Sequence, residues 1–127
     1  MIENLPTEYI EPIFDTLPVE ISFIDTTDTV RYYSKDGNRI FPRTPAVIGK
    51  KVQDCHPPKS LEKVEAILNG FRAGTMEKAE FWIQLGEKKV LIRYFAVKDK
   101  ENKYLGCLEV SQDITEIQKL DGEKRLL

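Results

Sequence analysis

The sequence predicts an α+β domain in which helices cover one face of a five-stranded antiparallel sheet. Segments in which apolar and polar residues alternate lie on both sides of a central helical pattern, and such alternation is typical of half-buried strands. Short polar turns separate consecutive strands, so neighbouring strands can pair in opposite directions. The helical periodicity lies outside these segments, which allows the helices to gather on one face of the sheet.

The first part of the chain predicts a helix followed by a β-hairpin. Residues 7–17 repeat apolar side chains at the helical spacing i, i+3, i+4, i+7, and Pro18 stops the helix. The residues of this apolar stripe are Ile10, Ile13, Phe14 and Leu17. Alternation from Val19 onward predicts a strand, the polar residues 25–29 predict a turn, and residues 30–34 predict a second short strand.

The middle of the chain predicts helical structure without strands. Glycine and proline punctuate residues 35–58, which favours short helical turns over one long element. Residues 60–73 predict the longest helix. Its apolar face consists of Leu61, Val64, Ile67, Leu68 and Phe71.

The C-terminal part predicts three strands and a final helix. Residues 78–85, 88–98 and 104–112 carry strand patterns and are separated by short turns. Residues 114–127 are mostly charged or polar. We expect them to begin a helix that leaves the domain.

The composition is typical of one globular domain and lacks the excess of positive charge found in proteins that bind nucleic acid. The 127 residues include 19 Lys and Arg against 21 Asp and Glu, a net charge of −2, whereas a domain that binds nucleic acid normally carries a cationic excess. No run approaches the roughly 20 apolar residues of a membrane-spanning helix, and the acidic N-terminus is unlike a signal peptide. We therefore expect a cytoplasmic protein that contacts neither membrane nor nucleic acid.

Two cysteines and one histidine limit the metal chemistry of the chain. They cannot complete a four-ligand zinc or iron–sulfur site from sulfur and imidazole alone. Cys55 and Cys107 are also too few for a disulfide framework, so we expect them to be buried thiols in a reducing compartment.

Three short motifs follow one another along the chain. The run Ile-Phe-Asp-Thr-Leu-Pro at residues 13–18 leads into a strand that ends at Asp25, Ile-Gly-Lys-Lys-Val occupies residues 48–52, and Asp-Ile-Thr occupies residues 113–115. With these motifs the chain resembles a PAS domain over residues 9–120. The sequences around the histidine and in the last strand further resemble a bacterial and archaeal subgroup often found behind hemerythrin-like segments.

The resemblance implies a single non-enzymatic sensory domain. Residues 1–17 would form an N-terminal flanking helix, residues 18–113 the PAS core, and residues 114–127 an exit helix for signalling. Such a module binds a small molecule or cofactor in its core cavity, forms a homodimer, and passes strain to an adjacent output or sensor domain of a longer protein. Asp113 is suited to cap the exit helix, which would couple the last strand to it.

His56 and Cys55 are the candidate cofactor ligands. The single imidazole precedes Pro57 and Pro58 at the entrance to the longest helix, where it could ligate a haem iron in the core cavity or bond only the local backbone. Cys55 beside it could supply thiolate or metal chemistry, or act as a small apolar side chain. Flavin is less expected than haem, because no segment resembles the Asn-Cys-Arg-Phe-Leu helix of flavin photosensors.

The last strand leaves open which of its faces is buried. Alternation places Cys107, Glu109 and Ser111 on one face and Leu108, Val110 and Gln112 on the other. Apolarity favours burial of the second set, whereas the resemblance to flavin-binding PAS domains implies that Ser111 points into the pocket. Glu109 would then be an inward carboxylate that needs a partner, for which Arg93 and Tyr94 on the neighbouring strand are candidates. The alternative is an exposed Glu109 at a sheet edge.

Two other function classes stay open at this point. The fold could be a small cone-shaped enzyme or lipid-binding domain with Glu109, His56 or Asp54 as acid or base, although no nucleophile–base pair is visible. It could also be a purely structural dimerisation domain with a filled core. For a homodimer, we expect the N-terminal helix and the outer face of the sheet, including Trp82, to be buried between the two copies.

Overall fold

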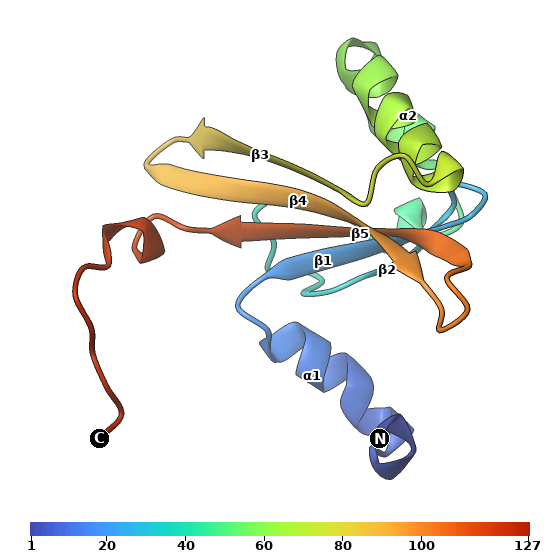
Figure 1. Cartoon of the computed structure of the whole chain (residues 1–127). Coiled ribbons are helices and arrows are strands. Elements are labelled where there is room, and N and C mark those ends of the chain that lie inside the picture. The colour runs from blue at the N-terminus through green and yellow to red at the C-terminus, as the bar shows by residue number, and fades with distance from the viewer.

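The computed structural model describes residues 1–127 and contains one five-stranded antiparallel sheet (Figure 1). Its strands are β1 (Glu20–Asp25), β2 (Val30–Tyr33), β3 (Lys78–Leu85), β4 (Lys88–Lys98) and β5 (Tyr104–Asp113). Their spatial order is β2-β1-β5-β4-β3, so the N-terminal hairpin pairs with the last strand. The predicted α+β fold class is confirmed.

Two α-helices lie on opposite sides of the sheet (Figure 1). Helix α1 (Ile10–Thr16) lies below it, and the ring of Phe14 packs 5.9 Å from the ring of Tyr32. Helix α2 (Pro58–Ala73) lies above it and ends at Gly74, whose positive φ of 74° suits a glycine after a helix. Short 3₁₀ turns complete the helical structure at Ile2–Asn4, Thr7–Tyr9, Pro45–Val47, Val52–Cys55 and Ile117–Lys119.

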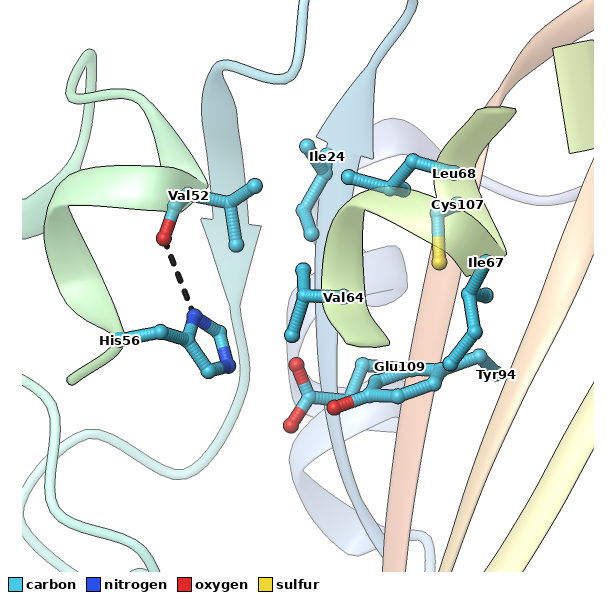
Figure 2. Close-up of a pocket in the computed structure, with 9 residues that line it drawn as sticks. All are labelled: Ile24, Val52, His56, Val64, Ile67, Leu68, Tyr94, Cys107 and Glu109. Carbon is cyan, nitrogen blue, oxygen red and sulfur yellow. Dashed lines mark hydrogen bonds between the residues drawn. The ribbon is translucent and has the colours of Figure 1, made fainter. Parts of the chain in front are cut away.

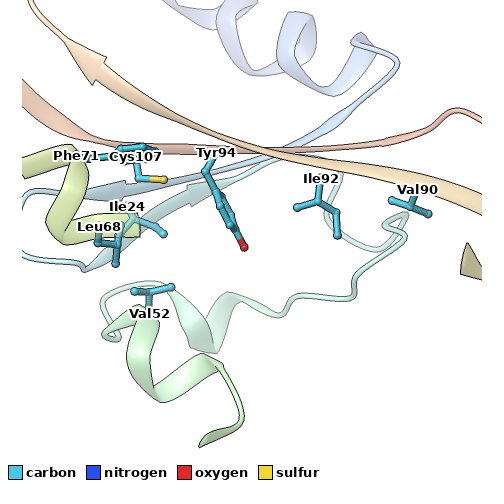
Figure 3. Close-up of a cluster of buried hydrophobic side chains, with 8 residues drawn as sticks. All are labelled: Ile24, Val52, Leu68, Phe71, Val90, Ile92, Tyr94 and Cys107. Carbon is cyan, nitrogen blue, oxygen red and sulfur yellow. The ribbon is translucent and has the colours of Figure 1, made fainter. Parts of the chain in front are cut away.

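The core lies between α2, with the turn that precedes it, and the face of the sheet opposite α1, here called the inner face (Figure 3). Eight buried side chains form it: Ile24, Val52, Leu68, Phe71, Val90, Ile92, Tyr94 and Cys107. Ile40 and Phe41 extend the core from the irregular segment between β2 and the Pro45–Val47 turn. Aromatic and branched side chains thus supply most of the buried apolar area, which is the dominant stabilising term.

The structure corrects the expected exit helix of residues 114–127. Only the turn Ile117–Lys119 is helical, and the rest of the segment runs away from the sheet (Figure 1). Leu120 is 80% exposed, so the segment lacks the packing that stabilises most short helices. Its start is nevertheless held by β4, because the Ile114 N–H donates to the Lys89 carbonyl over 2.8 Å.

Candidate functional site

The inner face of β5 carries three buried side chains, Cys107, Glu109 and Ser111, of which the last two are polar. Strand pairing places Cys107 opposite Ile24 and Glu109 opposite Ser22 on β1, so these side chains face α2. The apolar neighbours of β5 point to the side of α1, and Val110 is buried there. Both faces of this strand are therefore covered.

A small cavity lies between this face and α2 (Figure 2). Nine residues line it: Ile24, Val52, His56, Val64, Ile67, Leu68, Tyr94, Cys107 and Glu109. The space open to the centre of a water-sized sphere is about 10 Å³, which is room for about one water molecule. The walls are mainly apolar, and the polar atoms of His56, Tyr94 and Glu109 gather at one end (Figure 2).

His56 both closes the local turn and faces the cavity. Its Nδ1 lies 3.0 Å from the carbonyl oxygen of Val52. Since a carbonyl only accepts, Nδ1 must carry the proton, and Nε2 of the neutral ring is then an acceptor. The extended backbone that His56 adopts before Pro57 turns its ring toward Glu109 (Figure 2).

Glu109 is the electrostatic exception in the core. The residue is only 9% exposed, and neither carboxylate oxygen accepts a hydrogen bond from the protein. The nearest cation is the Nη2 of Arg43, 4.0 Å from Oε1. Burial raises the pKa of Glu109, and the charge of Arg43 only partly opposes this shift. Tyr94, its partner across the β4–β5 pairing, has a raised pKa because of burial and the Glu109 charge.

A second buried carboxylate, Glu20, is fully paired. Its Oε2 lies 3.4 Å from Nη2 of Arg39, and both side chains are 3% exposed. Its two oxygens also accept the backbone N–H groups of Ile40 (2.6 Å) and Phe41 (3.1 Å). This pairing holds the irregular segment in place, and the same segment positions Arg43 near Glu109. Sequence reasoning missed Glu20, Arg39 and Arg43, because a strand residue between apolar neighbours and arginines in an aperiodic loop give no signal of burial.

Three of the predicted site residues lie outside the cavity wall. Arg93 pairs with Val110 and therefore lies on the outer face, where its Nη2 is 3.3 Å from Oε1 of Gln112. It cannot reach Glu109, since neighbouring residues of a strand point to opposite faces. The Sγ of Cys55 contacts the Lys51 carbonyl at 3.6 Å instead of the cavity.

Ser111 is buried on the same face as Glu109 but lies further along β5, beyond the cavity wall. It is paired with Ile92 on β4 and with Glu20 on β1. The structure thus gathers His56, Tyr94 and Glu109 from the predicted set and separates them from Arg93, Cys55 and Ser111.

The cavity does not fit haem. It has room for about one water molecule, and the free nitrogen of His56 faces a carboxylate (Figure 2). No group of three or more His, Cys, Asp or Glu side chains is arranged to hold a metal ion. No helix has both the length and the apolar character needed to cross a membrane.

Comparison with known proteins identifies a family model and solved structures that are similar to this chain. A family model described as "PAS domain" matches residues 10–115. The chain is similar to the crystal structure of a C-terminal domain from Streptococcus mutans, with 36% identity, a TM-score of 0.85, and coverage of 92% of this chain and 91% of that one.

Two more distant structures share the fold alone. The PAS domain of Bordetella pertussis BvgS is 18% identical with a TM-score of 0.63, covering 88% of each chain. A sensory box sensor histidine kinase from Vibrio cholerae is 8% identical with a TM-score of 0.59, covering 85% of this chain and 90% of that one. No curated protein sequence is significantly similar to the chain.

Proposed function

The chain belongs to the PAS domain family, and on that basis we propose that it is a cytoplasmic, non-enzymatic sensory module. It binds a small molecule in the cavity beneath α2 and signals to an adjacent domain of a longer protein. The observation that carries this proposal is Glu109, a largely buried carboxylate at the end of an apolar cavity that accepts no hydrogen bond from the protein and has only a long ion-pair contact, 4.0 Å, with Arg43. Proteins rarely leave such a group unpaired, because its desolvation is costly.

The route of the signal is supported by the geometry of β5. Glu109 and Asp113 lie on this strand four residues apart, about 13 Å at the usual rise per residue. The Oδ1 of Asp113 accepts hydrogen bonds from the N–H (2.9 Å) and the Oγ1 (2.5 Å) of Thr115. A displacement of β5 at the cavity therefore moves the start of the C-terminal segment.

The chemistry of the cavity favours binding over catalysis. Burial raises the pKa of the Cys107 thiol to about 12, and the Glu109 charge contributes to this rise. The thiolate needed for nucleophilic attack is therefore absent at neutral pH.

We also propose that the protein is a homodimer formed through α1 and the outer face of the sheet. Ile13 (43%), Leu17 (38%) and Trp82 (65%) are exposed apolar side chains of these surfaces. Burying them stabilises a dimer by about 25 cal/mol per Å², and a self-complementary patch closes with two-fold symmetry. Sedimentation equilibrium should give a dimer for the full chain and a monomer without residues 1–17. A monomeric full chain at high micromolar concentration would contradict the proposal.

Ligand binding is tested by mass spectrometry of a denaturing extract from the purified protein. We expect the extract to contain a small molecule that is retained by the wild type and lost from Glu109→Gln. Glu87→Gln, which removes the same charge from an exposed hairpin turn, should retain it. Equal retention by all three proteins would exclude Glu109 from the site, and no retained molecule in any of them would contradict the sensory role.

A further inference from the structure

The polar end of the cavity is composed almost entirely of hydrogen-bond acceptors. In the neutral imidazole ring of His56 the Nε2 is an acceptor, because Nδ1 carries the proton and donates it to the Val52 carbonyl at 3.0 Å. The carboxylate of Glu109 adds two oxygens that accept no hydrogen bond from the protein. Only the hydroxyl of Tyr94 can donate there, and it carries a single proton (Figure 2).

The cations around the cavity do not supply the missing donors. Arg39 uses its Nε and both Nη groups for the carbonyls of Ile21, Ser34 and Phe41, the hydroxyl of Ser22 and the carboxylate of Glu20. Arg43 lies 4.0 Å from Glu109, beyond hydrogen-bond distance, and its side chain is partly exposed at the rim. The negative charge of Glu109 is therefore only loosely compensated.

We propose that the ligand of this cavity is a compact protonated amine, held by the Glu109 carboxylate and the His56 Nε2, with its apolar part against α2. An ammonium group carries three donors and one positive charge, so it satisfies these acceptors and neutralises the carboxylate. Charge-assisted hydrogen bonds of this kind are stronger than neutral ones. The inference rests on the proposed function, since it names the ligand class of the same cavity.

The remaining walls set the shape of the amine. Val64, Ile67 and Leu68 of α2 and Ile24 of β1 offer only apolar contact. The present space admits a group about the size of one water molecule, which matches an ammonium or methylammonium head. A longer alkyl chain requires α2 to move away from the sheet. Carboxylates are disfavoured, because they would bring a second negative charge next to Glu109.

The test is a titration of ¹⁵N-labelled full chain at pH 7 with four probes at equal ionic strength: methylammonium, propylammonium, propanol and propionate. Amide shifts are followed on β5, from Cys107 to Ser111. We expect saturable binding of the ammonium probes at least about tenfold tighter than that of propanol, from the difference between charged and neutral hydrogen bonds. Propionate should not bind at the cavity.

Two variants separate the role of charge from that of packing. Glu109→Gln keeps the size of the side chain, and it should abolish the preference for propylammonium over propanol. Arg43→Met removes the cation that competes for the carboxylate, so it should strengthen ammonium binding and leave propanol binding unchanged. This gain is a second readout if Glu109→Gln does not fold, and Glu87→Gln is the matched control.

The outcomes distinguish the amine class from the ligand site itself. Propanol or propionate binding as tightly as propylammonium would overturn the amine class and leave a ligand-binding cavity. Unchanged ammonium affinity in Arg43→Met together with retained preference in Glu109→Gln would also overturn it. If no probe shifts the β5 amides, the amine inference fails. The proposed function fails with it only if the denaturing extract of the wild type also contains no small molecule.

Discussion

Replacing Arg39 with methionine is expected to lower the free energy of unfolding by about 3–5 kcal/mol, the usual cost of breaking a buried ion pair from one side. The guanidinium and the Glu20 carboxylate are each 3% exposed. Methionine fills a similar volume, but it leaves a buried negative charge with two backbone donors, from Ile40 and Phe41. It also removes the donors to the carbonyls of Ile21 and Ser34.

This loss is large for a domain of this size, since typical stabilities are about 5–15 kcal/mol. With a urea m-value of about 2 kcal/mol/M, the midpoint of unfolding should fall by roughly 1.5–2.5 M. Arg125→Met is the matched control, because its side chain is 73% exposed and surface substitutions usually change stability by less than about 0.5 kcal/mol.

The double variant Glu20→Gln/Arg39→Met tests whether the cost comes from the unpaired charge. The amide side chain of the first substitution is neutral and keeps an acceptor for the backbone N–H groups, so we expect the double variant to be more stable than Arg39→Met alone by about 1–3 kcal/mol. A single variant that loses less than about 1 kcal/mol, or a double variant no more stable than the single one, would refute the reasoning.

Three further predictions concern single residues. Burial raises the pKa of Glu109 in the fold, so the folded carboxyl keeps its proton at pH values where the unfolded chain has lost it. The free energy of unfolding should therefore fall as the pH rises from about 4.3 toward that raised pKa. Urea titrations of Glu109→Gln at several pH values should lack this decrease. Gly106→Ala should lower the free energy of unfolding, measured by thermal melts, by at least about 2 kcal/mol, because its φ is 149° and an added Cβ would overlap the Ile24 carbonyl oxygen. The control Gly37→Ala, which has open space around the added Cβ, should lower it less. Asp113→Ala should lower the melting temperature, because it removes the oxygen that accepts hydrogen bonds from the N–H and the Oγ1 of Thr115, and an unchanged melting temperature would contradict its role at Thr115.

The strands could be predicted from sequence because their signals are local. The ranges predicted for β3 and β4, residues 78–85 and 88–98, coincide with those of the structure. Alternation marks each strand over its whole length, and Gly86 adopts the positive φ of 62° that the hairpin turn between them requires. The prediction of a C-terminal helix was wrong because the signal for such a helix is not local. A short polar helix depends on packing against the rest of the protein, which its own sequence does not encode.

Alternation identifies the two faces of a strand but not which one meets the core when both are covered. On β1, Ile21 is buried toward α1 while Glu20 and Ser22 are buried toward α2. A single-faced sheet would have placed the two polar residues in water. The partners of Glu20 come from the irregular segment at residues 39–41, where no periodic pattern exists from which to infer contact.

The two buried glutamates show how a structural charge differs from one available to a ligand. Both lie on the inner face of the sheet, and both break the pattern of an apolar core. Glu20 has two backbone amides and a guanidinium within reach, so its burial is balanced and it holds the chain in one arrangement. Glu109 has only a guanidinium at 4.0 Å. Violations of core patterning that the protein does not compensate are expected at functional sites, and the number of donors, more than burial, is therefore the reason to propose Glu109, and not Glu20, as the binding residue.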